Sequence, residues 1–151
     1  MIQIRWHALL FVVWALGLMF TSCEWDDDDD DEENAPQARS LHNQLRDGPW
    51  YVSHFSTYGR NQTDDFIPYS LYFEESGRVR VLEGGQEITE GSWRTEFDDG
   101  ELELYIQHLN NQTALGELND DWYLKSETDM ELRFEEDEEP GERLHIHRIA
   151  E

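Results

Sequence analysis

Hydrophobic and polar positions alternate along most of the chain after residue 50, with the period of two that is typical of β-strands. Leu102, Leu104 and Ile106, for example, are each separated by one polar or amphipathic residue. The same pattern predicts about eight strands, in or near residues 50–58, 69–73, 79–81, 88–97, 102–106, 122–124, 130–134 and 144–148. Short strands with one apolar face, separated by turns, indicate an antiparallel sandwich or an up-and-down barrel.

Turn residues and one short helix complete the predicted architecture. Gly84-Gly85 and Asp99-Gly100 are strong hairpin signals. Gly91, inside a strand pattern, is expected to mark a bulge. Residues 38–45 are expected to form one helix, which Gly48 and Pro49 end. The polar stretch after residue 110 is expected to hold a single helical turn near residues 115–118.

The first 22 residues have the composition of a secretory signal. Arg5 is their only Lys or Arg, and an apolar run follows over residues 8–20. A transmembrane helix is the alternative, but the run is shorter than the roughly 20 residues that a span needs. We therefore predict a signal peptide over residues 1–22.

Cys23 follows this segment and is the only cysteine of the chain. Phe20-Thr21-Ser22-Cys23 resembles the lipobox of bacterial lipoproteins, although its first position is Phe where Leu is usual. The resemblance implies cleavage before Cys23 and lipidation of that cysteine, which would anchor the protein firmly to a membrane. Lipidation would also explain an unpaired thiol in a secreted protein.

The chain has a net charge of −24, and all of its acidic residues follow Cys23, so the mature protein would be strongly negative. This charge excludes nucleic acid as a partner and disfavours close contact with anionic headgroups. Residues 23–36, which include a run of acidic residues, are expected to form a disordered tether before a domain over residues 37–151. The acidic run also resembles the export signal of Bacteroidetes-type lipoproteins. That resemblance implies an outer-membrane anchor facing the cell exterior, with the periplasmic side as the alternative.

Arg148 is unusual because strict alternation turns it inward with Leu144 and Ile146. A cation that faces a core needs a partner. Trp50, at the other end of the domain, could supply one through a cation–π contact worth about 0.5–2 kcal/mol.

Gly48-Pro49-Trp50 and Arg148 resemble the G-x-W motif and the last-strand arginine of lipocalins. More closely, residues 41–149 resemble the lipocalin-like domain of bacterial lipoproteins. The matching pieces are Trp50-Tyr51-Val52, Phe55, Thr63-Asp64-Asp65-Phe66, Tyr72-Phe73, Gly91-Ser92-Trp93, Asp120-Asp121-Trp122 and Glu131-Leu132. The resemblance implies an all-β, eight-stranded antiparallel barrel of the lipocalin or calycin type. It also implies a cup for a small apolar ligand, although such a barrel can equally be filled by its own side chains.

If the barrel is a cup, its ligand contacts are expected from one histidine and four aromatic residues: His54, Tyr69, Phe73, Trp93 and Trp122. By alternation His54 faces inward between Val52 and Ser56, either as a buried neutral histidine hydrogen-bonded to a hydroxyl or backbone group or as a polar contact for the ligand. Packing into a filled core is the alternative role for the aromatic residues.

The sequence offers no constellation that indicates catalysis, a cofactor or a metal. His145 and His147 are expected on the outer face of the last strand, and two ligands do not make a zinc site. The acidic pairs 64–65, 98–99 and 120–121 are explained by turns in a chain this acidic. We therefore expect a non-enzymatic protein. It would be either a carrier of a small hydrophobic or amphiphilic ligand, or a structural and protein-interaction module of the envelope.

Overall fold

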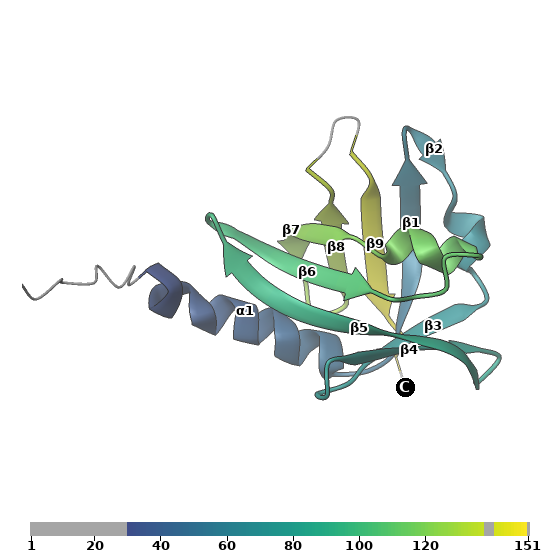
Figure 1. Cartoon of the computed structure of the whole chain (residues 1–151), viewed down its shortest axis with the longest axis horizontal. Coiled ribbons are helices and arrows are strands. Elements are labelled where there is room, and N and C mark those ends of the chain that lie inside the picture. The colour runs from purple at the N-terminus through teal and green to yellow at the C-terminus, as the bar shows by residue number, and fades with distance from the viewer. Residues whose placement is uncertain (1–29, 138–140, 151) are drawn as a thin grey trace, which may run out of the picture.

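The residues that the structure describes form nine β-strands, and the eight that correspond to the alternating segments close into an antiparallel barrel (Figure 1). The computed structural model describes residues 30–137 and 141–150, so the predicted signal peptide and Cys23 lie outside the described residues. The elements are α1 (Asp30–Arg46), β1 (Trp50–Thr57), β2 (Arg60–Asn61), the 3-10 helix η1 (Thr63–Phe66), β3 (Tyr69–Phe73), β4 (Arg78–Glu83), β5 (Gln86–Asp98), β6 (Glu101–Gln107), the 3-10 helix η2 (Ala114–Leu118), β7 (Asp121–Glu127), β8 (Glu131–Glu135) and β9 (Arg143–Arg148).

The strands follow one another around the barrel in chain order. Each strand from β3 to β9 pairs with the next, and β9 pairs with β1 to close the ring. The two-residue strand β2 only extends the hairpin that follows β1. The pairing of β1 with β3 is short, with Trp50 opposite Leu71. The predicted all-β, eight-stranded up-and-down barrel is confirmed, as is a helical turn near residues 115–118, which is η2.

Helix α1 begins at Asp30, earlier than the expected start at residue 38. Pro36 lies inside the helix, where it lacks the N–H for one helical hydrogen bond, and apolar periodicity is visible only after it. Residues 30–36, expected in the tether, therefore belong to α1. Leu41 and Leu45 are fully buried and pack α1 against the barrel. Within the described chain, no helix has the length and apolar character needed to cross a membrane.

Single-residue bulges change which way the side chains point. In β1 the register shifts between Val52, opposite Ile146, and His54, opposite His145. Ser53 is the extra residue, and Phe55 rather than His54 points into the core. The expectation that His54 faces inward is therefore wrong, because a bulge inverts the alternation that follows it.

Gly91 is not the bulge that the sequence indicated. The register of β4 and β5 shifts elsewhere, between Val81 and Leu82, while Gly91 stays paired with Val79. A Cβ atom at Gly91 would collide with the carbonyl oxygen of Gln107 and lie 3.1 Å from Cδ2 of Leu109. The glycine is required because the backbone that ends β6 passes directly against it.

Replacing Gly91 with alanine should destabilise the barrel by about 1–3 kcal/mol, because a backbone oxygen cannot move aside as a side chain can. Urea unfolding followed by circular dichroism would measure the change. Gln86→Ala, an exposed position on the same strand, serves as the control and should change stability by no more than about 0.5 kcal/mol. Equal effects of the two substitutions would contradict the close approach.

Candidate functional site

The start of β1 and the end of β9 form one closed end of the barrel. Trp50 is fully buried, and its indole N–H donates to the carbonyl oxygen of Leu45 at 2.8 Å. The guanidinium carbon of Arg148 lies 5.8 Å from the centroid of the Trp50 ring. Arg148 also forms an ion pair with Asp47 and donates to the carbonyl oxygens of Asp47 and Asp129. Arg148 therefore ties together the segment before β1, the end of β9 and the turn between β7 and β8.

Helix α1 covers the rest of this end. The ring of His42 stacks on Trp93, with 4.5 Å between the centroids, and the Thr95 hydroxyl donates to the carbonyl oxygen of Ala38. Burial lowers the pKa of His42, and the nearby Arg46 lowers it further. Gln44 donates to the carbonyl oxygen of Thr128 in the turn between β7 and β8. These contacts hold α1 across this end of the barrel, and we call a segment that covers an end of the barrel a plug.

The opposite end is closed by the two 3-10 helices, which lie beside each other in Figure 1. Phe66 of η1 and Leu115 and Leu118 of η2 are buried. Trp122 is also fully buried, and its indole N–H donates to the carbonyl oxygen of Leu118 at 3.0 Å. The ring of Phe55, inside the barrel, is 4.8 Å from that of Phe66. The mouth of the predicted cup is therefore occupied by side chains of the chain itself.

The residues proposed as ligand contacts do not come together around an open cup. Phe73, Trp93 and Trp122 belong to one hydrophobic core cluster, and Tyr69 packs partly buried against it. His54 lies on the outer face, where its ring is 4.8 Å from the ring of His145. The structure thus places the aromatic candidates in the packing role that the sequence offered as the alternative.

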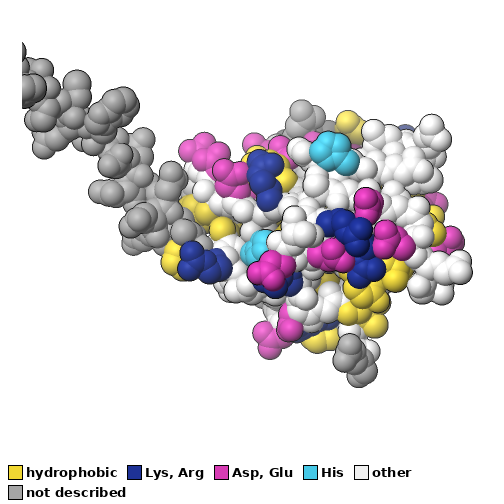
Figure 2. Space-filling view, turned by 60° about the horizontal axis from the view of Figure 1, so that its bottom comes forward, with side chains coloured by type: hydrophobic (Ala, Val, Ile, Leu, Met, Phe, Trp, Pro, Cys, Tyr) yellow, Lys and Arg dark blue, Asp and Glu magenta, His cyan; other side chains and the backbone are white. Residues whose placement is uncertain are grey.

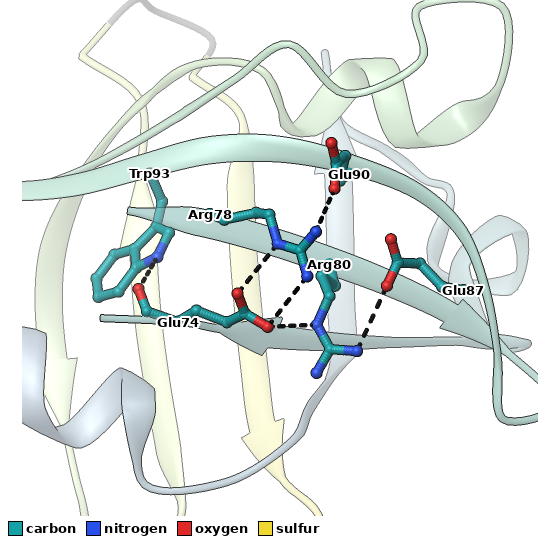
Figure 3. Close-up of polar contacts among 6 residues, drawn as sticks. All are labelled: Glu74, Arg78, Arg80, Glu87, Glu90 and Trp93. Atoms are coloured by element: carbon teal, nitrogen blue, oxygen red, sulfur yellow. Dashed lines mark hydrogen bonds and ion pairs between the residues drawn. The ribbon is translucent and has the colours of Figure 1, made fainter. Parts of the chain in front are cut away.

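An arginine–glutamate network covers the side of the barrel formed by β4 and β5 (Figure 3). The Glu74 carboxylate pairs with Arg78 at 3.0 Å and with Arg80 at 2.6 Å. Arg78 also pairs with Glu90, and Arg80 with Glu87. The hydrogen bond from Arg78 is the main reason that the pKa of Glu74 is lowered. In the space-filling view, basic side chains lie against acidic ones (Figure 2). The network of Figure 3 pairs two arginines with three glutamates, so each of its cations already has carboxylate partners.

Three carboxylates converge at the end that η2 closes. Asp120, Glu136 and Glu142 can bring ligand oxygens within 4.8 Å of one another. Burial raises the pKa of Glu142, and the hydroxyl of Thr57, which donates to its carboxylate, opposes that shift. Calcium takes about six to eight oxygen ligands, and three half-buried acids fall well short of that number. We assign no metal to this cluster.

A second acidic position lies on the outer face of β6. Glu103 is only 4% exposed and accepts a hydrogen bond from the Tyr105 hydroxyl. That hydrogen bond raises the pKa of Tyr105 well above its usual value. The guanidinium of Arg94 covers the Tyr105 ring at 3.7 Å, and burial raises the pKa of the neighbouring Asp121. Because Arg94 already covers the Tyr105 ring, we interpret the contacts among Glu103, Tyr105 and Arg94 as local packing.

Sequence reasoning missed Asp47 and Phe66 as closing residues. Asp47 directly precedes the Gly48-Pro49-Trp50 motif, and the resemblance that pairs this motif with Arg148 was the signal for an acidic partner there. Phe66 ends the piece Thr63-Asp64-Asp65-Phe66 that resembles the lipocalin-like domain, and this match was the available signal.

No family model and no curated protein sequence matches the chain. Among solved structures, the chain is similar to a DUF4847 family protein from Bacteroides vulgatus. The TM-score is 0.50 at 13% identity, and the alignment covers 74% of this chain and 99% of the other. A lipocalin-like protein from Bacteroides uniformis gives a TM-score of 0.47 at 15% identity, covering 70% and 99% of the two chains. An uncharacterized protein from Bacteroides eggerthii gives 0.45 at 11% identity, covering 68% and 98%. At such identities the similarity to the first of them supports the eight-stranded antiparallel barrel fold alone.

Replacing Arg148 with methionine should lower the free energy of unfolding by about 1–3 kcal/mol, because two backbone carbonyls and the Trp50 ring lose their partner. Asp47→Asn should cost about 0.5 kcal/mol or less, because the Asp47 side chain is 75% exposed and asparagine can still accept the hydrogen bond. Thermal and urea unfolding would compare the two variants. Equal losses would mean that the exposed ion pair, rather than the carbonyl and indole contacts, carries the closure.

Proposed function

We propose that this protein is a lipid-anchored, non-enzymatic protein of the bacterial cell envelope whose barrel is a solid interaction module. In this proposal the barrel carries no ligand inside, and the protein makes its contacts through its outer surface. The observation that carries the proposal is the closure of the barrel at both ends by residues of the chain itself. An envelope carrier of a small apolar ligand is the alternative, and it would require one of these ends to open.

Burial supports a filled interior. One hydrophobic cluster runs from Leu41 and Leu45 in α1 to Leu115 and Leu118 in η2. Both plugs are held by an indole N–H that donates to a helix carbonyl, from Trp50 at one end and from Trp122 at the other. Opening either end would leave a buried indole N–H without its acceptor and expose apolar surface, both of which cost free energy.

The anchor is supported by the sequence of the first 23 residues. The apolar run ends in small residues before the single cysteine, and the charged residues that follow are acidic. A strongly negative domain is repelled by anionic headgroups, so a lipid on Cys23 would hold it near the membrane while the domain stays in solvent. The acidic run after Cys23 supports placement on the exterior of the outer membrane, with the periplasmic side as the alternative.

Native mass spectrometry of the full mature protein, purified gently from its own host, tests the filled barrel. We expect the mass of the lipidated polypeptide alone, because the interior is already packed. Comparing native with denatured spectra separates covalent lipid from any bound molecule. A reproducible extra mass that disappears on denaturation would overturn the proposal in favour of the carrier.

Cys23→Ser should abolish incorporation of radiolabelled fatty acid and move the protein from the membrane fraction to the soluble or precursor fraction. Ser22→Ala is the matched control, because it keeps a small residue before the cysteine and should be labelled normally. Protease treatment of intact cells would then tell exterior from periplasmic placement. Undiminished labelling of Cys23→Ser would contradict the anchor at Cys23.

A further inference from the structure

Two β-bulges turn polar side chains onto the outer face of the barrel. In β1, the bulge at Ser53 moves His54 outward, opposite His145. In β7, the register shifts between Leu124, opposite Phe134, and Ser126, opposite Arg133. With uninterrupted alternation, Ser126 would point into the core with Leu124, just as His54 would with Val52. Both bulges therefore deliver a polar residue to the same side of the same four-stranded segment.

The result is a continuous row of polar side chains across four strands. His54 of β1 is paired with His145 of β9, which is paired with Arg133 of β8, which is paired with Ser126 of β7. Neighbouring strands lie about 4.8 Å apart, so the four side chains stand next to one another in one line. We call the groove along this row, about 350 Å³ in volume, the basic groove. Its lining residues are His54, Lys125, Ser126, Arg133, Glu135, Arg143 and His145.

The basic groove is unusual in a chain with 35 acidic and only 11 basic residues, because three of its lining residues are Lys or Arg and two more are His. Each of these three cations is ion-paired: Lys125 with Glu101 at 2.7 Å, Arg133 with Glu131 at 2.8 Å and Arg143 with Glu135 at 3.2 Å. A ligand would therefore be held by the remaining hydrogen-bond donors and not by net charge. Each guanidinium has five N–H donors, so one carboxylate leaves several of them available.

The local electrostatics favour an anion over a metal ion. Burial is the largest cause of the lowered pKa of His145, and His54, Arg133 and Arg143 lower it further, against the opposing effect of Glu131. These neighbours make it harder to add positive charge at the imidazole, and they would repel a cation in the same way. The guanidinium N–H groups that the single carboxylate partners of Arg133 and Arg143 leave available can instead donate to an anion.

We infer that the basic groove binds a tetrahedral oxyanion, a phosphate or sulfate group, with Arg133, Arg143 and Lys125 supplying charge and His54, His145 and Ser126 supplying hydrogen-bond donors. Charge-assisted hydrogen bonds from several directions suit such a group. This inference rests on the proposed function, in which the outer surface makes the contacts. Because the negative charge of the domain disfavours an anionic membrane surface, we expect a free anion, and an anionic lipid headgroup is the other source that the test distinguishes.

Binding should strengthen as pH falls. His145 faces Lys125, Arg133, Arg143, Glu131 and Glu135 and lies opposite His54, and protonation of the His145 ring adds both a donor and a positive charge. Sulfate is the better probe for this comparison, because its charge does not change over the range, whereas that of phosphate does. Sulfate affinity should therefore be higher at pH 5.5 than at pH 7.5.

The test is a titration of the full chain, in a neutral detergent, with sodium sulfate and with inorganic phosphate, followed by the imidazole NMR resonances. We expect saturable shifts of His54 and His145, and Arg133→Gln should weaken sulfate binding about tenfold or more. Arg94→Gln is the matched control, because Arg94 also pairs with a glutamate two residues away on its own strand but lies outside the groove. It should change affinity by less than about twofold.

A second arm tests the source of the oxyanion, with flotation on phosphatidylcholine vesicles with and without phosphatidylglycerol. Binding that needs phosphatidylglycerol and is lost in Arg133→Gln would assign the group to a lipid headgroup, whereas sulfate and phosphate binding alone would assign it to a free anion. Absence of saturable shifts, or equal weakening by Arg133→Gln and Arg94→Gln, would overturn the inference. An extra native mass that persists in Arg133→Gln would come from the barrel interior, whereas one that is lost in Arg133→Gln would come from the groove, so the two proposals fail separately.

Discussion

The structure depends on the need to satisfy buried indole N–H groups at the two ends of the barrel. A tryptophan buries a large apolar surface but carries one donor that cannot be left unpaired. Trp50 and Trp122 solve this in the same way, each by donating to a carbonyl of a helical segment that precedes it by a few residues, Leu45 in α1 and Leu118 in η2. Each hydrogen bond fixes a helical segment over an opening of the barrel.

This arrangement places side chains of the chain itself at both openings of the barrel. Eight strands enclose an interior that side chains can fill, and here both openings are covered by segments that contribute buried leucines. Trp93 reinforces the first plug, because its indole N–H donates to the carbonyl oxygen of Glu74 while its ring stacks on His42. The same residue type thus closes the barrel, positions α1 and anchors the turn between β3 and β4.

The alternation of the sequence predicted the strand count and most of the inward set, because each strand exposes only one face to the core. It failed at His54 and Gly91 for one physical reason. A bulge adds a residue without leaving a clear signal in composition, so Ser53 inverted the orientation of His54 while Gly91, a residue typical of bulges, stayed in register.

The partner of Arg148 was only partly predictable, because Asp47 and the carbonyl of Asp129 come from loops that alternation does not place. The filled mouth could not be predicted, since η1 and η2 lie in polar segments whose contacts are set by tertiary packing.

Because the described residues cover both ends of the barrel, our proposal places its contacts on the outer surface, where the bulges change which side chains are presented. Each bulge interrupts the ladder, and those in β1 and β7 stand on either side of β8 and β9. Without the bulges, His54 and Ser126 would point into the core. With them, both side chains lie on the outer face, opposite His145 and Arg133 respectively. The core does not require those polar residues there, because Phe55 and Leu124 already pack inward around the two bulges. Irregularities that the interior does not need are best understood as shaping the surface, and on an acidic protein they gather cationic groups and hydrogen-bond donors in one groove.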